Sequence, residues 1–108
     1  MYFVYQLKPI SENQQLKYQS FDQLENPPQF INYSMIFSSL LHWSQNVDSI
    51  VQKLHQDNDL LNKVTVAASD ILVLERNDVC FAYYIDPFGF ISCPDFATQH
   101  MIQYDKED

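Results

Sequence analysis

The stretch CFAYYIDPFGFISCPDF, residues Cys80–Phe96, contains both cysteines of the 108-residue chain and its only glycine. Apolar and aromatic residues lead up to Asp-Pro-Phe-Gly, a combination typical of a tight turn between two strands. Gly89 supplies the backbone freedom that such a turn requires. The Asp86 carboxylate, at the first turn position, can accept hydrogen bonds from backbone N–H groups two residues on. Its aromatic surroundings would also suit general acid–base work, but the turn role is the simpler interpretation.

After the turn, a short returning strand and then a helix are expected. Residues 90–93 (FISC) have the length and composition of a strand. Pro94 and Asp95 suit the first turn of a helix, because proline lacks an N–H that would be unpaired there and an acidic side chain complements the helix dipole. One face of this helix would carry Phe96, Ala97, His100, Met101 and Tyr104.

Before the turn, the sequence predicts a β-hairpin. Two strand-like segments, DILVLER (70–76) and VCFAYYI (79–85), flank the pair Asn77-Asp78. Asn and Asp tolerate positive φ angles, so the pair suits a two-residue loop. Apolar residues on both faces indicate a hairpin that lies centrally in its sheet or is covered on both sides. The loop length sets the cross-strand pairs, which are Leu74 with Phe81 and Leu72 with Tyr83 on one face and Val73 with Ala82 on the other.

The N-terminal half adds two strands and a helix. The segments YFVYQLK (2–8) and Tyr33–Phe37 are rich in aromatic and β-branched residues, as strands are. Between them, Ser20 and Gln23 have the spacing of a capping box, which predicts one or two helical turns over Phe21–Asn26. A clearer helix follows. Ser44 or Asn46 can cap it, and its apolar face is formed by Val47, Ile50, Val51 and Leu54.

Strands and helices in mixed order, joined by hairpins, predict an α+β fold. We expect a small, mostly antiparallel sheet of about four to five strands with two to three helices packed on it. The length suits one domain with its own core, which we place at residues 1–104. Residues 105–108 (DKED) are expected to form an acidic C-terminal tail.

The acidic composition indicates which kinds of partner the protein can bind. Fourteen Asp and Glu residues against six Lys and Arg give a formal charge of −8. The basic residues are scattered singly, whereas nucleic-acid-binding proteins cluster them against phosphates. Direct binding to nucleic acid or to an anionic membrane is therefore not expected. An acidic protein favours a basic partner surface, such as the nucleic-acid-binding groove of another protein, although the charge also serves solubility.

The lack of recognisable targeting segments and the pattern of the cysteines predict a cytoplasmic protein. No apolar run approaches the ~20 residues that span a bilayer, and the first residues lack the basic region of a signal peptide. Cys80 and Cys93 lie in strand-like apolar segments without CxxC spacing, as expected of two reduced, buried cysteines. No cofactor is expected.

The most distinctive pattern resembles that of the YodL-like domain family. It consists of Tyr-Tyr-aliphatic-Asp-x-Phe-Gly-Phe followed by Pro-acidic-Phe, here Tyr83–Phe90 and Pro94–Phe96. YFVYQLK, NYSMIF and SDILVLERND match in the same order, so the resemblance covers the chain from Tyr2 to about Phe96. It implies a small domain of Gram-positive bacteria, phages and mobile elements, with no established catalytic activity. Residues 55–68 depart from the family pattern, so the resemblance bears on the fold more than on the partner.

Two groups of residues are candidates for chemistry. Cys93, Asp95 and His100 resemble a thiol nucleophile with a base, but the helical rise places Cys93 and His100 roughly 9–10 Å apart. Packing roles are therefore expected for both. The second group, His42, His55, His100 and the cysteines, shows no metal-binding spacing, so no metal site is expected.

These observations favour a non-catalytic protein-binding module of phage or mobile-element origin that engages a host protein. Its most concrete form is an inhibitor of a host defence nuclease, of the anti-CRISPR or anti-restriction type, acting through an acidic surface. The alternatives are a scaffold domain for another mobile-element protein and an enzyme that depends on a cysteine or a metal. The oligomeric state is left open. The candidate partner-binding residues are aromatic and acidic residues at turns and loops, namely Phe88, Tyr83, Tyr84, Trp43, Asp57, Asp59, Glu75, Asp78 and Asp86.

Overall fold

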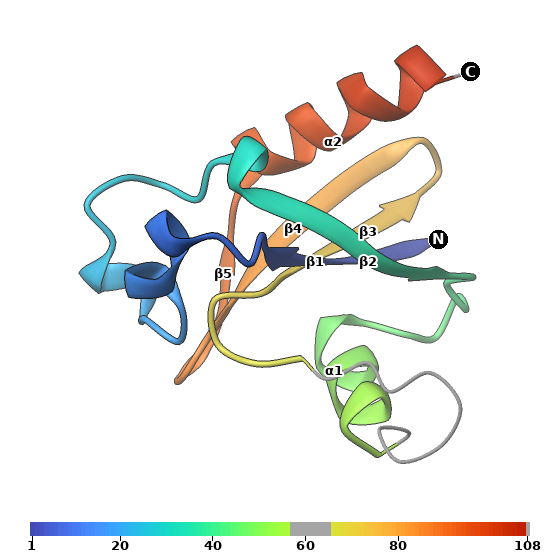
Figure 1. The fold of residues 1–108 in the computed structure, drawn as a ribbon. Coiled ribbons are helices and arrows are strands. Elements are labelled where there is room, and N and C mark those ends of the chain that lie inside the picture. Colours follow the sequence, from blue (N-terminus) through green and yellow to red (C-terminus); the bar gives the residue numbers. More distant parts are fainter. Residues whose placement is uncertain (57–65, 108) are drawn as a thin grey trace.

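The computed structural model describes residues 1–56 and 66–107, and the side chains within 1–54 and 66–103. One antiparallel sheet has the strand order β2-β1-β3-β4-β5. Its strands are β1 (Tyr2–Leu7), β2 (Tyr33–Ser39), β3 (Ile71–Arg76), β4 (Val79–Asp86) and β5 (Gly89–Ser92). Two α-helices, α1 (Val47–Gln56) and α2 (Pro94–Glu107), lie on opposite sides of this sheet (Figure 1). The expected α+β class and antiparallel sheet are confirmed.

The β3–β4 hairpin has the register that its sequence predicts. Leu72 pairs with Tyr83, Val73 with Ala82, and Leu74 with Phe81. Asn77 and Asp78 have φ angles of 51° and 66°, the left-handed conformation that a two-residue hairpin loop requires. The hairpin supplies the central strand β3, in which Ile71, Leu72, Val73 and Leu74 are all buried. The expectation of a central hairpin covered on both faces is confirmed.

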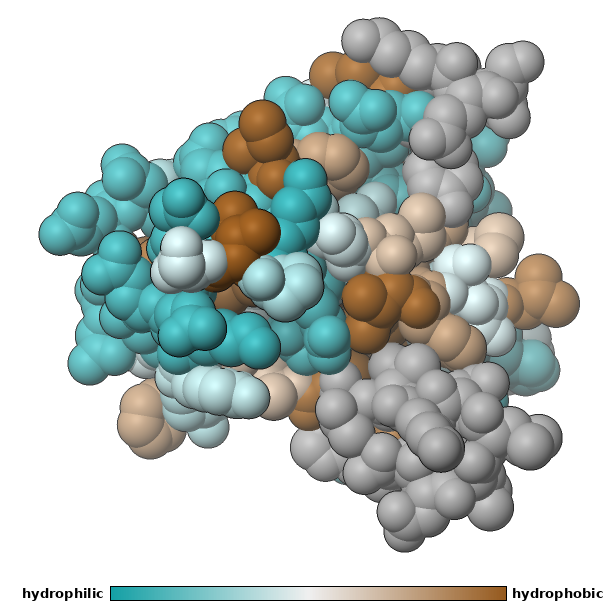
Figure 2. Space-filling view, in the orientation of Figure 1, coloured by the Kyte–Doolittle hydropathy of each residue, from teal (hydrophilic) through white to brown (hydrophobic). Residues whose placement is uncertain are grey.

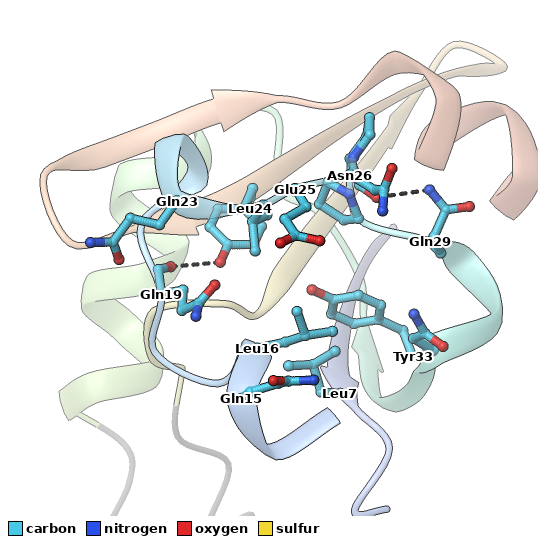
Figure 3. Close-up of a pocket in the computed structure, with 14 residues that line it drawn as sticks. Leu7, Gln15, Leu16, Gln19, Gln23, Leu24, Glu25, Asn26, Gln29 and Tyr33 are labelled. Atoms are coloured by element: carbon cyan, nitrogen blue, oxygen red, sulfur yellow. Dashed lines mark hydrogen bonds between the residues drawn. The ribbon is translucent and has the colours of Figure 1, made fainter. Parts of the chain in front are cut away.

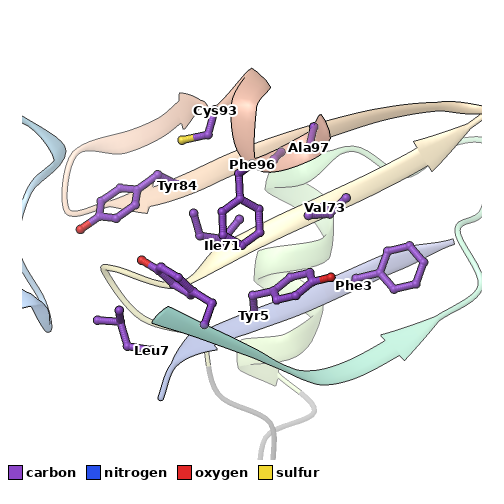
Figure 4. Close-up of a cluster of buried hydrophobic side chains, with 11 residues drawn as sticks. Phe3, Tyr5, Leu7, Ile71, Val73, Tyr84, Cys93, Phe96 and Ala97 are labelled. Carbon is purple, nitrogen blue, oxygen red and sulfur yellow. The ribbon is translucent and has the colours of Figure 1, made fainter. Parts of the chain in front are cut away.

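One face of the sheet carries a core rich in aromatic side chains (Figure 4). Tyr5, Tyr33 and Phe30 surround Phe96 of α2, with ring centroids 5.1–5.3 Å from it. Tilted and edge-on aromatic pairs of this kind add to the stabilisation that burial provides. The buried members of this core are Phe3, Tyr5, Leu7, Tyr33, Ile71, Val73, Ala82, Tyr84, Cys93, Phe96 and Ala97.

The opposite face is covered by α1. Ile50 and Leu54 are buried against Val4, Leu72 and neighbouring side chains, and Val47 and Val51 pack at the edge of the same cluster. The predicted apolar face of the helix is confirmed. Of the two predicted caps, Asn46 is the one observed, since its Oδ1 accepts a hydrogen bond from the Ser49 backbone N–H at 2.9 Å.

Three short 3₁₀ segments precede β2, and one of them is a single turn within residues 21–26, where one or two helical turns were predicted. They are η1 (Ser11–Leu16), η2 (Phe21–Gln23) and η3 (Phe30–Asn32). The Ser20 side chain makes no capping hydrogen bond, so the predicted capping box is wrong. The physical reason is that the Gln23 N–H, which a capping box would pair with the Ser20 side chain, bonds instead to the Ser20 backbone carbonyl at 3.0 Å. The first N–H of η2, from Phe21, bonds to the distant Asp86 carboxylate at 2.7 Å.

Helix α2 packs with Phe96, Ala97 and His100 buried, as predicted, whereas Met101 is exposed. The Tyr104 side chain lies outside the described side chains. Helical backbone continues to Glu107, through most of the segment expected as a tail. Within the described residues, no helix combines the length and the apolar character needed to cross a membrane.

Candidate partner-binding surface

The turn between β4 and β5 is held by the carboxylate of Asp86. Asp86 pairs with Gly89 across the turn. One carboxylate oxygen, Oδ2, accepts a hydrogen bond from the Phe88 backbone N–H at 3.1 Å, and the other, Oδ1, accepts one from Phe21 at 2.7 Å. Gly89 has a φ of +156°, which side-chain-bearing residues rarely adopt. The predicted turn role of Asp86 is thus observed, and the carboxylate also joins the turn to η2.

Phe88 stands at the tip of this turn and is 92% exposed. The turn projects at the end of the sheet opposite to the β3–β4 hairpin (Figure 1). Two hydrogen bonds on Asp86 and the pairing of β4 with β5 fix the backbone beneath the ring. A large aromatic side chain therefore faces solvent, and its backbone would lose little conformational entropy on binding.

A cavity of about 270 Å³ lies on the same side of the molecule, under the 3₁₀ segments (Figure 3). It adjoins the β4–β5 turn through two contacts. The Tyr84 hydroxyl donates to the Gln19 carbonyl at 2.6 Å, and Asp86 accepts from Phe21. The residues that line it are Leu7, Gln15, Leu16, Gln19, Gln23, Leu24, Glu25, Asn26, Pro27, Pro28, Gln29, Asn32, Tyr33 and Tyr84.

The lining of the cavity is polar and rich in side-chain amides. Six Gln and Asn residues contribute, with Glu25 as the one charged residue among those that line it. Each amide can both donate and accept hydrogen bonds, which suits a peptide backbone or another neutral polar group. Figure 2 shows hydrophilic side chains gathered over η1 and η2, with a few hydrophobic ones between them.

The two tyrosines at the base of the cavity are structural. Tyr33 donates to the Ser69 carbonyl at 2.8 Å, and burial raises the pKa of its hydroxyl far above the ordinary value. Burial is also the main cause that raises the pKa of Tyr84 to about 12. Both hydroxyls therefore remain protonated donors across the physiological pH range.

The predicted partner-binding residues do not form one surface. Tyr84 is buried, with its hydroxyl bonded to the Gln19 carbonyl, and Tyr83 is half-buried beside the core under α1. The alternation of a strand explains the difference from the prediction, because adjacent tyrosines point to opposite faces of a sheet that is covered on both sides. Phe88 and Asp86 remain together at the β4–β5 turn.

Trp43, Glu75 and Asp78 lie at the other end of the sheet. Trp43 is 82% exposed, and its backbone carbonyl accepts a hydrogen bond from Arg76 at 2.9 Å. Arg76 directly precedes the β3–β4 loop, so the eight-residue strand β4, roughly 25 Å long, separates this group from Phe88. Asp57 and Asp59 lie outside the described residues.

Cys93 and His100 take the packing roles expected from their spacing. Cys93 is buried, and its thiol donates to the Ile91 carbonyl at 3.6 Å. Burial raises the pKa of this thiol, the opposite of what activates a nucleophile. The Nδ1 atom of His100 lies 2.6 Å from the Tyr5 hydroxyl, and burial lowers the pKa of His100 to about 4. Asp95, the third member of the predicted group, is exposed.

Asp70, which no sequence pattern singles out, is a buried carboxyl group. Its Oδ2 accepts hydrogen bonds from the Ala67 backbone N–H at 2.8 Å and from Gln6 at 3.4 Å. Burial raises the pKa of this carboxyl group to about 6, even though these bonds act in the opposite direction. The group directly precedes β3, and its carboxylate connects the Ala67 backbone to Gln6 of β1.

Comparison with known proteins identifies a domain family. A family model described as the YodL-like domain matches residues 1–96. That range contains the whole sheet, the cavity and the β4–β5 turn, and it ends within the first turn of α2. No curated protein and no solved structure matches the chain.

Proposed function

The chain belongs to the YodL-like domain family, and on that basis we propose that it is a non-catalytic module that binds a protein partner. The observation that carries this proposal is Phe88, 92% exposed on a turn that the Asp86 carboxylate holds rigid. The cavity beside the turn offers amides for hydrogen bonds to the partner. We call Phe88 together with this cavity the recognition surface.

The energetics favour Phe88 as an anchor. Burying a phenylalanine side chain in a partner contributes about 1.5–3 kcal/mol. Ordering a flexible loop on binding would offset part of that gain, but the backbone around Phe88 is already fixed. Aromatic anchors of this kind dominate interface energetics when neighbouring contacts exclude water.

The partner that best complements the chain is basic. The formal charge of −8 favours approach to a surface of the opposite sign. In its most specific form, the proposal is that the module engages a host defence nuclease at a groove that otherwise binds nucleic acid. The alternative partner is another protein of the same phage or mobile element.

The state of Cys93 supports a binding role over cysteine chemistry. A nucleophilic thiol needs a lowered pKa and access to substrate. Cys93 is buried, its thiol pKa is raised, and His100 is engaged with Tyr5. We expect a Cys93→Ser variant to retain partner binding in full.

An affinity capture from a lysate of a Gram-positive host, read by mass spectrometry, tests the proposal. Wild type would be compared with Phe88→Ala, with Trp43→Ala at the opposite end of the sheet, and with Ile31→Ala, which removes another exposed apolar side chain, from η3. We expect a basic protein that wild type, Trp43→Ala and Ile31→Ala all capture and Phe88→Ala does not.

Two results would contradict the proposal. Capture of the same partner by Phe88→Ala would remove Phe88 from the interface, and capture of no protein by wild type would argue against a soluble partner. If only Trp43→Ala failed to capture the partner, the binding surface would lie at the β3–β4 end of the sheet instead. A captured protein encoded by the same mobile element would select the scaffold alternative.

A further inference from the structure

We propose that Glu75, Cys80 and His100 form a binding site for a transition-metal ion of the zinc class. This inference concerns the end of the sheet opposite to the recognition surface and goes beyond the proposed function. One ligand atom from each of the three residues lies within 4.8 Å of the other two. The Cys80 Sγ and the Glu75 carboxylate oxygen Oε2 are 3.9 Å apart.

The fold brings the three residues together from three elements. Glu75 near the end of β3 pairs directly with Cys80 near the start of β4. Two residues along each strand, Val73 and Ala82 belong to the core beneath α2, so Glu75 and Cys80 face the same side of the sheet. The helix α2 crosses that face and places His100 above them, fully buried.

The spacing of the donor atoms is close to that of a bound metal ion. Zinc binds sulfur at about 2.3 Å and nitrogen or oxygen at about 2.0–2.2 Å. At tetrahedral angles, those lengths put neighbouring donor atoms about 3.4–3.6 Å apart. The observed separations are 3.9 Å between sulfur and oxygen and at most 4.8 Å within the trio, so the donor atoms must move closer together to bind the ion.

The chemistry of the donors selects the class of metal. A thiolate, an imidazole and a carboxylate together suit zinc and cobalt, whereas magnesium and calcium prefer oxygen donors alone. Neither cysteine is in a disulfide, so the Cys80 sulfur is reduced. Binding as a thiolate releases one proton from Cys80 to solvent.

A positioning residue for the imidazole is also present. The Tyr5 hydroxyl lies 2.6 Å from Nδ1 of His100, and the Phe3 ring packs on the imidazole with centroids 4.4 Å apart. Metal-binding histidines are commonly oriented through the second ring nitrogen in this manner. With Nδ1 bonded to Tyr5, Nε2 is the nitrogen that would bind the metal.

A water molecule would complete the coordination of the metal ion, because the trio supplies only three ligands. Glu75 and Cys80 are half-buried, so water can reach the fourth position of a tetrahedral ion. His100 lies beyond residues 1–96, the range of the family match. The site would join the β3–β4 hairpin to α2.

Cobalt titration of the chelator-stripped, reduced protein tests the site. Cobalt reports thiolate coordination by a charge-transfer absorption band and tetrahedral geometry by its visible bands. We expect both bands, their loss when zinc is added, and a higher melting temperature with zinc than without it. The test variants are Cys80→Ser and Glu75→Gln, with Cys93→Ser and Asp78→Asn as matched controls that change the other cysteine and a nearby exposed carboxylate.

We expect Cys80→Ser to lose the charge-transfer band and zinc affinity, and Glu75→Gln to weaken zinc binding. Tyr5→Phe should lower affinity by roughly 10–100-fold and keep the charge-transfer band. Both controls should match wild type. The proposal is overturned if wild type shows no thiolate–cobalt band, or if Cys80→Ser binds zinc as tightly as wild type.

Discussion

Asp70 shows how a single buried group sets the pH dependence of stability. It is 6% exposed and sits between the segment before β3 and Gln6 of β1. Burial raises the pKa of its carboxyl group from 3.8 to about 6. Between those two values, the folded protein holds a proton that the unfolded chain has released. Its contribution to stability is therefore complete below pH 4 and is lost as the pH rises through 6.

We expect Asp70→Asn to gain stability relative to wild type as the pH rises from about 4 to 6.5. The variant cannot ionise, so it avoids a cost on the order of 1–3 kcal/mol. His100, with a pKa lowered to about 4, has a contribution of the opposite sign that is lost as the pH falls. Because His100 is common to both proteins, the difference in unfolding free energy, measured by urea denaturation at several pH values, isolates Asp70. A difference that is constant with pH would contradict the raised pKa.

At the level of elements, one carboxylate connects two distant parts of the chain. Asp86 closes the β4–β5 turn by accepting from Phe88, and it caps η2 by accepting from Phe21, 65 residues earlier. Tyr84 makes a parallel connection to the Gln19 carbonyl. The 3₁₀ segments and the turn therefore hold one another in place, and the cavity lies between η1, η2 and the sheet.

We expect Asp86→Ala to lower the unfolding free energy by on the order of 1–3 kcal/mol, because two backbone N–H groups lose their acceptor. Hydrogen exchange should accelerate at Phe21 and Phe88 in this variant. Asp22→Ala, which removes an exposed carboxylate from η2 itself, is the matched control and should change stability by less than about 0.5 kcal/mol. Equal destabilisation by the two variants would show that Asp86 has no special role in the turn.

The sequence predicted the elements whose signals are local and failed where a distant group decided the structure. The β3–β4 register follows from Asn77-Asp78 and the length of the loop. The α1 face follows from apolar spacing, and its cap from Asn46. The bond from the Phe21 N–H to Asp86 was not predicted, because local spacing cannot reveal a partner 65 residues away.

At the scale of the whole molecule, the sheet separates two ends with different properties. Phe88, the turn and the amide-lined cavity occupy one end. Trp43, Asp78 and the Glu75–Cys80–His100 trio occupy the other. The sequence pointed to Phe88 and Asp86 through turn chemistry. It could not reveal the cavity or the trio, since both depend on how α2 and the 3₁₀ segments pack on the sheet.

Charge and the aromatic anchor should control different steps of binding. The net charge of −8 acts at long range and is screened by salt, so it should set the association rate. Phe88 acts only in the docked complex, so it should set the dissociation rate. This division follows from placing an exposed aromatic residue on a rigid turn of an acidic protein.

Association and dissociation rates for the captured partner, measured for wild type and Phe88→Ala at low and high salt, test the proposed recognition surface most directly. We expect salt to slow association of both proteins alike, and Phe88→Ala to dissociate roughly 30-fold faster, the effect of losing a hot spot of about 2 kcal/mol. Phe88→Ala should unfold at the same urea concentration as wild type, because its ring is outside the core. A dissociation rate that Phe88→Ala leaves unchanged would contradict the proposed role of this turn.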